Sequence, residues 1–160
     1  MHLTRIDLPE PKRATVTRIL NERLAELIDL KLQIKQAHWN VKGPNFISLH
    51  KLFDEFAGTV EEQIDETAER ITALGGTAEG TLAAVASRTS LPAYSVTLTS
   101  GRGHIDALAS AMAAVGKVTR LAIDETAGLG DADSADLLTG ISRELDKQLW
   151  FLEAHLQSAE

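Results

Sequence analysis

Four long stretches of the chain repeat apolar residues three or four positions apart, the spacing of an amphipathic helix. They cover about residues 14–39, 46–74, 102–126 and 134–157. No run alternates apolar and polar residues long enough to predict a strand. The repeating positions of the four stretches are, in chain order, Leu20, Leu24, Leu27, Ile34 and His38; Leu49, Phe53, Phe56, Val60, Ile64 and Ile71; Ile105, Leu108, Met112, Val115 and Ala122; and Leu138, Ile141, Leu145, Leu149, Leu152 and Leu156. The pattern predicts an all-α protein.

The connections between these helices predict their arrangement. Gly43 and Pro44 end the first helix, and the Gly75–Gly76 pair ends the second. Short loops join the first helix to the second and the third to the fourth, so each pair is expected to be antiparallel. A longer connection, rich in Gly, Thr and Ser, has room for a short helix over residues 79–87. This crossover predicts a ferritin-like four-helix bundle; an ordinary bundle with a flexible loop is the alternative.

Length and composition narrow the class of protein. The 160 residues correspond to one domain, with a bundle over residues 14–158 after an N-terminal arm of residues 1–13. The chain has no cysteine, which excludes disulfide scaffolds, zinc fingers, iron–sulfur clusters and thiol enzymes. Its apolar runs are too short for a transmembrane helix, and residues 1–7 lack the apolar stretch of a secretory signal. The absence of cysteine is compatible with a reducing cytoplasm.

The charge balance favours cations as ligands. The chain has 16 Lys and Arg against 23 Asp and Glu, a formal net charge of −7. His38 ends the first helix, and the second carries His50 and Asp54 and then Asp65 and Glu69. His50 and Asp54 are spaced i, i+4, and so are Asp65 and Glu69. This spacing places the two side chains of each pair on neighbouring turns of one helix face. Imidazole and carboxylate together suit iron, manganese or zinc.

Helical geometry places these candidate ligands away from the bundle core. Each residue turns the helix by about 100°, so the angle of a side chain around the helix axis can be measured from His50. That angle is about 40° for Asp54, about 60° for Asp65 and about 100° for Glu69, whereas the centre of the apolar stripe lies at about −80°. Asp54 and Asp65 are separated by about 16 Å of helix, and a metal–ligand bond measures roughly 2 Å. An antiparallel twofold partner would bring Asp65 and Glu69 opposite His50 and Asp54, so the spacing predicts a metal site shared between subunits.

Two observations bear on this prediction. The intra-bundle di-iron sites of ferritin-like proteins use Glu-x-x-His, which occurs nowhere in this chain. Pairs of His and Asp at i, i+4 also occur on solvated helix faces, and the second helix is acidic throughout. A structural bundle whose acids only solvate its surface is therefore the alternative.

The segment 36–46, with sequence QAHWNVKGPNF, and the His50, Asp54, Asp65 and Glu69 that follow it resemble the bacterial Dps family, the DNA-binding proteins from starved cells or mini-ferritins. Segments 136–138, 142–147 and 149–153 are similar to the last helix of that family. The resemblance spans nearly the whole chain. It implies a hollow dodecamer of identical four-helix subunits, located in the bacterial cytoplasm or nucleoid.

The resemblance also implies an activity. In the family, ferroxidase centres lie at twofold interfaces, with His38, His50 and Asp54 contributed here by one subunit and Asp65 and Glu69 by its mate. Members bind Fe²⁺, oxidise it, usually with hydrogen peroxide, and store ferric oxyhydroxide inside the shell. A pair of ferrous ions supplies both electrons that peroxide needs, so hydroxyl radical is not released. This chemistry protects cells against oxidative stress.

Other polar and aromatic residues receive weaker assignments. Trp39, beside His38, either intercepts a stray oxidising equivalent, as aromatic residues near the centre do in the family, or packs at an interface. His104 and His155 lack partners at ligand spacing, so we expect them at the surface or an interface. The acids of residues 131–136 complement the dipole of the last helix. In the family, acids of this region also line a pore for iron entry.

DNA is a second possible partner. Family members that condense DNA commonly use mobile Lys-rich tails, and residues 157–160 form no basic tail. The charged residues of the first eighteen are Arg5, Lys12, Arg13 and Arg18, against Asp7 and Glu10. A DNA-compacting particle with secondary iron chemistry is thus the alternative function.

Overall fold

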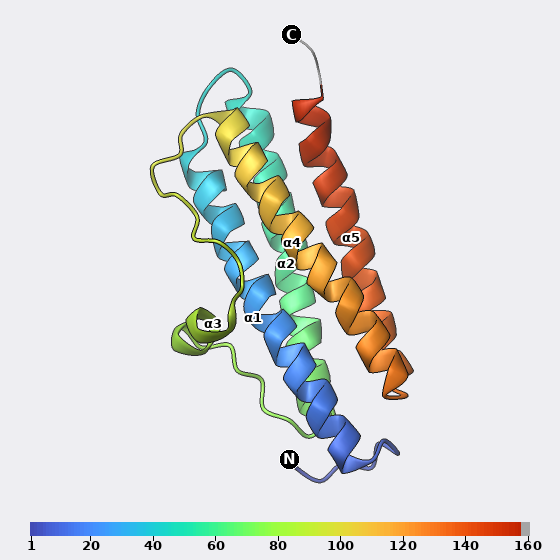
Figure 1. The fold of residues 1–160 in the computed structure, drawn as a ribbon. Coiled ribbons are helices and arrows are strands. Elements are labelled where there is room, and N and C mark those ends of the chain that lie inside the picture. Colours follow the sequence, from blue (N-terminus) through green and yellow to red (C-terminus); the bar gives the residue numbers. More distant parts are fainter. Residues whose placement is uncertain (158–160) are drawn as a thin grey trace.

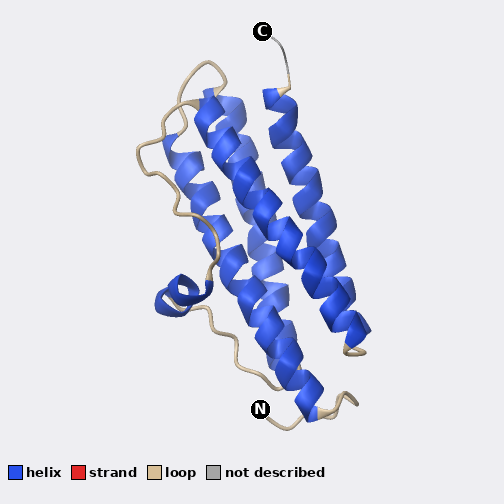
Figure 2. Cartoon of the chain, in the orientation of Figure 1, coloured by secondary structure: helices blue, strands red, loops and turns tan. Residues whose placement is uncertain are grey.

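The computed structural model describes residues 1–157 and contains five helices over that range. They are α1 (Glu10–Asn40), α2 (Phe46–Ala73), α3 (Leu82–Arg88), α4 (Gly101–Gly128) and α5 (Ala132–Leu156). Within this range the chain has no strand (Figure 2), and none of its helices is long and apolar enough to cross a bilayer. The predicted bundle end at residue 158 lies outside the described residues.

The order and directions of the helices confirm the predicted ferritin-like bundle (Figure 1). α1 and α2 are antiparallel, as are α4 and α5, and the long crossover returns along α1 so that α4 runs parallel to α2. The short crossover helix, α3, begins at Leu82, three residues later than predicted. Its first turn is capped by the Thr81 hydroxyl, which accepts a hydrogen bond from the backbone N–H of Ala84.

Polar side chains of α1 hold the crossover in place, so it is not a free loop. The Ser90 hydroxyl donates to the buried Glu26 carboxylate at 2.7 Å. The Thr89 hydroxyl donates to Asp29 at 2.6 Å, and Gln33 donates to the backbone carbonyl of Pro92 at 3.2 Å. These three α1 residues are spaced three and four apart, so they lie along one side of the helix.

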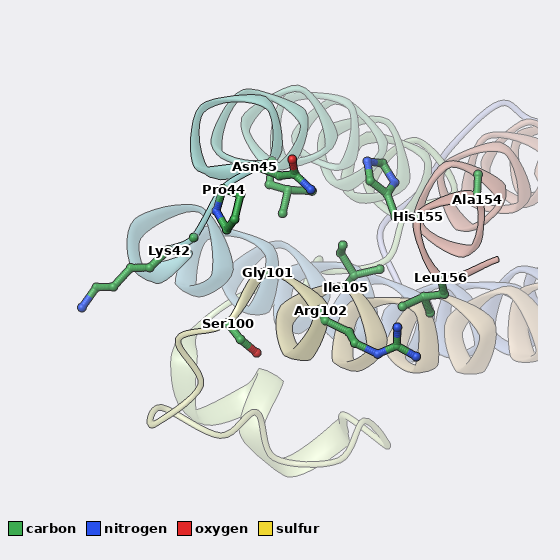
Figure 3. Close-up of a pocket in the computed structure, with 12 residues that line it drawn as sticks. Lys42, Pro44, Asn45, Ser100, Gly101, Arg102, Ile105, Ala154, His155 and Leu156 are labelled. Atoms are coloured by element: carbon green, nitrogen blue, oxygen red, sulfur yellow. The ribbon is translucent and has the colours of Figure 1, made fainter. Parts of the chain in front are cut away.

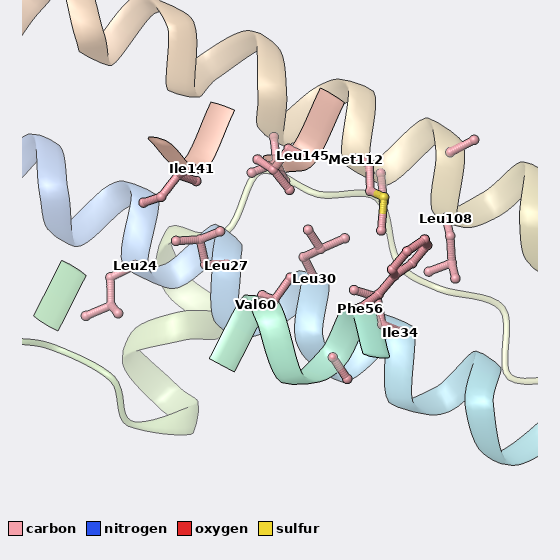
Figure 4. Packing of buried hydrophobic residues seen from close by; sticks show 14 of the residues in the cluster. Leu24, Leu27, Leu30, Ile34, Phe56, Val60, Leu108, Met112, Ile141 and Leu145 are labelled. Atoms are coloured by element: carbon pink, nitrogen blue, oxygen red, sulfur yellow. The ribbon is translucent and has the colours of Figure 1, made fainter. Parts of the chain in front are cut away.

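The four predicted apolar stripes meet in one core (Figure 4). All four apolar positions of α1 and all five of α4 are buried. In α2 and α5 the predicted positions are also buried except Ile64, Leu149 and Leu156, which are half-buried at the edge of the core. Phe53 is the largest fully buried side chain, and burying such a side chain contributes about 3 kcal/mol.

The N-terminal segment is more closely attached to the bundle than predicted. α1 begins at Glu10 rather than near residue 14, because proline is tolerated in the first helical turn, where Pro11 lies. The buried Arg13 donates to the carbonyls of Leu8 at 3.0 Å and Leu74 at 2.7 Å. The backbone N–H of His2 donates to the carbonyl of Gly75 at 2.7 Å. The first residues therefore pack against the end of α2.

Gly75 shows how close this contact is. Its φ is +84°, a left-handed conformation that side chains disfavour. A Cβ at this position would also lie 2.4 Å from the carbonyl oxygen of His2. Glycine is therefore required both by the turn that ends α2 and by the approach of the N-terminal segment.

The prediction for His104 was wrong. Its side chain is fully buried in the first turns of α4, and its Nδ1 lies 2.6 Å from the hydroxyl of Tyr94 in the crossover. Burial lowers the pKa of His104, so this imidazole is neutral near pH 7 and shares one hydrogen bond with the Tyr94 hydroxyl through its Nδ1. His155, by contrast, is exposed, as expected.

Candidate metal centre

The turn between α1 and α2 brings His38 and His50 together. The Nδ1 of His38 lies 2.7 Å from the carbonyl oxygen of His50, and the Nδ1 of His50 lies 2.9 Å from the carbonyl oxygen of His38. The two rings stack with centroids 3.8 Å apart and planes inclined by 21°. Each helix thus orients the imidazole of the other through its backbone.

These reciprocal hydrogen bonds fix the tautomer of both rings. A carbonyl oxygen only accepts, so each Nδ1 carries the proton and donates it. In the neutral imidazole this leaves a lone pair on each Nε2, the form that binds a metal, and such support from a carbonyl is typical of metal-binding histidines. The Nε2 of His38 faces the Oδ1 of Asp54 at 3.9 Å. His38 therefore lies between a second imidazole and a carboxylate at one end of the α1–α2 pair.

Asp54 is paired with a lysine that the sequence analysis did not single out. The Nζ of Lys35 donates to Oδ1 of Asp54 at 2.7 Å. This hydrogen bond holds the pKa of the Asp54 carboxyl below its ordinary value; the charges of Lys35, His38 and His50 act in the same direction, and loss of hydration opposes them. The available signal was spacing, since Lys35 precedes His38 by three residues and shares its helix face.

Asp65 and Glu69 lie elsewhere along α2. Both side chains are exposed, on turns about 16 Å and more beyond Asp54. Within residues 1–157, no three His, Cys, Asp or Glu side chains of the single chain form a group that could hold a metal ion. The structure thus places His38 beside both His50 and Asp54, without a complete metal-binding group in the single chain, and leaves Asp65 and Glu69 at a distance.

The candidate ligands do not line an enclosed cavity. A pocket of about 680 Å³ lies at the end of the bundle, between loop residues 42–45, the start of α4 and the end of α5 (Figure 3), and neither imidazole lines it. A groove of about 690 Å³ runs between α2 and α5 and is lined by Glu69 and other acids, but not by Asp65. The Asp54 side chain is 58% exposed. A metal bound at the two imidazoles and Asp54 would therefore lie at the subunit surface.

The acidic turn before α5 divides into two kinds of residue. Asp131 is buried and accepts hydrogen bonds from the backbone N–H and hydroxyl of Ser134, and it pairs with Arg70 of α2 at 2.6 Å. It therefore caps α5, as the helix-dipole interpretation expects. Asp133 and Asp136 are exposed and line the α2–α5 groove, where Asp133 also lies 3.8 Å from the Arg70 guanidinium.

Comparison with known proteins places this geometry in a family. A ferritin-like domain family matches residues 17–160. The DNA protection during starvation protein of Agrobacterium fabrum is 49% identical over 156 residues, which cover 98% of this chain and 96% of the relative. The chain belongs to the Dps proteins of the ferritin-like family.

Solved Dps structures share the complete fold. Dps of Mycobacterium smegmatis superposes with a TM-score of 0.94 at 37% identity, over 99% of this chain and 96% of that one. DpsC of Streptomyces coelicolor superposes with a TM-score of 0.95 at 30% identity, over 99% and 92% of the two chains. In this Dps chain, as in those structures, one ferritin-like bundle accounts for nearly the whole length.

Proposed function

We propose that this protein is an iron-sequestering ferroxidase that oxidises Fe²⁺ at sites shared between two subunits. The observation that carries the proposal is the His38–His50 pair, whose Nδ1 atoms are bound to backbone carbonyls so that each Nε2 can bind a metal, with the Nε2 of His38 lying 3.9 Å from Asp54. Membership in the ferritin-like family supports iron as the metal. Iron is here the substrate and the stored cargo.

A second subunit would complete the site. His38, His50 and Asp54 form one half, and Asp65 and Glu69, on the same exposed side of α2, would form the other half for an antiparallel mate. Large apolar side chains near the imidazoles are exposed in the single subunit and would be buried by a second one. The exposed fraction is 64% for Trp39, 58% for Ile47 and 44% for Phe46. Exposed apolar surface of this kind marks an interface. We propose that six such pairs assemble as the dodecameric shell of the Dps family.

The two halves would supply complementary chemistry. Two neutral imidazoles bind Fe²⁺ without changing its charge, and three carboxylates favour the ferric product, which is the harder ion. Each of two ferrous ions gives one electron to a single hydrogen peroxide, whose O–O bond breaks to give two hydroxide equivalents. Hydrolysis of the ferric ions then releases protons and ferric oxyhydroxide. The acids of the α2–α5 groove would receive the cations on their way to the interior.

Ferrous oxidation with added peroxide tests the site. We expect His38→Ala and Asp65→Ala each to slow the initial oxidation by at least about tenfold, because each removes one ligand from the shared site. Glu55→Ala is the matched control, since Glu55 is also an exposed acid, next to Asp54 in sequence, and is not a proposed ligand; this variant should oxidise iron at the wild-type rate. Unchanged oxidation in His38→Ala and Asp65→Ala would end the assignment. A particle mass corresponding to a monomer would contradict storage in a shell.

DNA compaction is less well supported by the contacts of the N-terminal segment. Of the four basic residues among the first eighteen, Arg13 is buried and donates to backbone carbonyls, and Arg18 pairs with Glu22 at 2.8 Å. We therefore expect no gel retardation of duplex DNA at physiological salt and weak retardation at low salt. Retardation that persists at physiological salt would favour the DNA-compacting alternative. Masses of the protein–DNA mixture by light scattering would check the result independently.

A further inference from the structure

Two lysines of α1, spaced i, i+4, form ion pairs with acids of α2. Lys31 pairs with Glu61, and Lys35 pairs with Asp54 at 2.7 Å. Both lysines are about one quarter exposed, at 30% and 24%, and their partners are similarly exposed, at 57% and 58%. The two pairs are close equivalents in position and setting, but Glu61 is not a proposed ligand and Asp54 is.

The ammonium of Lys35 lies where it acts on the metal ligands directly. It donates to the same Oδ1 of Asp54 that lies 3.9 Å from the Nε2 of His38. It also lies 5.6 Å from the centroid of the Trp39 ring, within the range of a cation–π contact. The ammonium therefore has two favourable neighbours, a carboxylate that would bind metal and an aromatic face that would not.

We propose that Lys35 competes with divalent cations for the Asp54 carboxylate and thereby lowers the metal affinity of the shared site. This inference rests on the proposed function. A metal ion bound to Asp54 and His38 would lie roughly 5 Å from an ammonium held at Oδ1, and the repulsion between one and two positive charges at that distance is substantial. Metal binding at Asp54 is therefore weakened as long as the ammonium keeps its hydrogen bond to Oδ1. The Trp39 ring gives it a second position on the same side of α1.

Such competition suits a site through which iron passes. Iron that is oxidised at the interface must leave for the interior of the shell, and a site that binds too tightly would retain it. Lys35 weakens the half-site formed by His38, His50 and Asp54, so that metal binding there depends on the two carboxylates of the mate. In this role Lys35 is a positioning residue that acts through Asp54.

Zn²⁺ is the suitable probe, because it is not oxidised and accepts imidazole and carboxylate ligands. Its affinity for the assembled protein is measured by calorimetry in wild type and in Lys35→Met, which keeps the unbranched side chain and removes the charge. We expect Lys35→Met to bind Zn²⁺ about tenfold more tightly. Lys31→Met removes the equivalent pair at Glu61 and should keep the wild-type affinity. Lys35→Arg restores the charge and should return the affinity to the wild-type range.

The outcomes separate this inference from the proposed function. Unchanged or weaker Zn²⁺ binding by Lys35→Met, with normal binding by wild type, would overturn the competition and leave the metal site intact. Equal tightening in Lys31→Met and Lys35→Met would also overturn it, since a general change in charge would then explain both. If wild type and His38→Ala bind Zn²⁺ equally, the site itself is absent and the inference is lost with it. Melting temperatures of the metal-free variants show that each is folded.

Discussion

Mixed particles of His38→Ala and Asp65→Ala subunits should oxidise ferrous iron faster than particles of either variant alone. In a shared site, a mixed dimer pairs the intact imidazole half of one subunit with the intact carboxylate half of the other. It therefore has one complete site of two. Random pairing makes half of the dimers mixed, so about a quarter of the wild-type rate is expected. The measurement is peroxide-driven iron oxidation by co-expressed, doubly tagged particles.

A second mixture is the control for this complementation. His38 and Asp54 belong to the same half of the proposed site, so a mixture of His38→Ala and Asp54→Ala subunits leaves neither site of a mixed dimer complete. It should stay as inactive as each variant. If both mixtures form mixed particles and both remain inactive, the ligands are not shared between subunits in this way. Asp54 and Asp65, about 16 Å apart along α2, would then not contribute to the same kind of site.

Arg70→Met should strongly destabilise the subunit. Arg70 joins α2 to the start of α5, where it pairs with Asp131 at 2.6 Å and donates from Nε to the Ser134 hydroxyl at 2.9 Å. The Asp131 side chain is only 3% exposed, so removing the guanidinium leaves a buried carboxylate without its counter-ion. We expect a loss of about 3 kcal/mol and a melting temperature about 6 to 12 °C lower. Thermal melts at one protein concentration measure this, since assembly also affects the melting temperature.

Arg120→Met is the matched comparison. Arg120 and Asp146 form an ion pair of similar length, 2.8 Å, between α4 and α5, but both side chains are at least half exposed. Water solvates the remaining carboxylate, so the expected loss is below about 1 kcal/mol. Equal losses in the two variants would show that burial of Asp131 adds nothing to the strength of its pair.

The helices were predictable because their stability depends on a periodic pattern that the sequence displays. The residues at which the helices begin and end were less predictable. The Pro9–Glu10–Pro11 run indicates a break in the helix, and the contact of Arg13 with Leu74 that extends α1 joins residues far apart in the chain. His104 illustrates the same limit. As an isolated histidine it gives no signal of burial, which depends on the position that the crossover gives Tyr94.

Part of the candidate site was also predictable from the sequence, and part was not. The residue types and i, i+4 spacing of His50, Asp54, Asp65 and Glu69 are properties of one helix, so their position away from its apolar side followed from the sequence; the three acids are exposed and His50 is half-buried. The ion pair of Lys35 with Asp54 did not, since it joins two helices.

By itself, the amino-acid sequence determined which segments are helical, which sides of them are apolar, how the loops order the helices, and which side chains have metal-binding chemistry. Each of these depends on residues within a few turns of one another. The tertiary structure decided what the partners of those side chains are. The fixed tautomers of His38 and His50, the counter-ion of Asp54 and the burial of Asp131 all arise where separate helices meet. Local periodicity carries no information on such contacts, because the packing angle and the offset between helices set them.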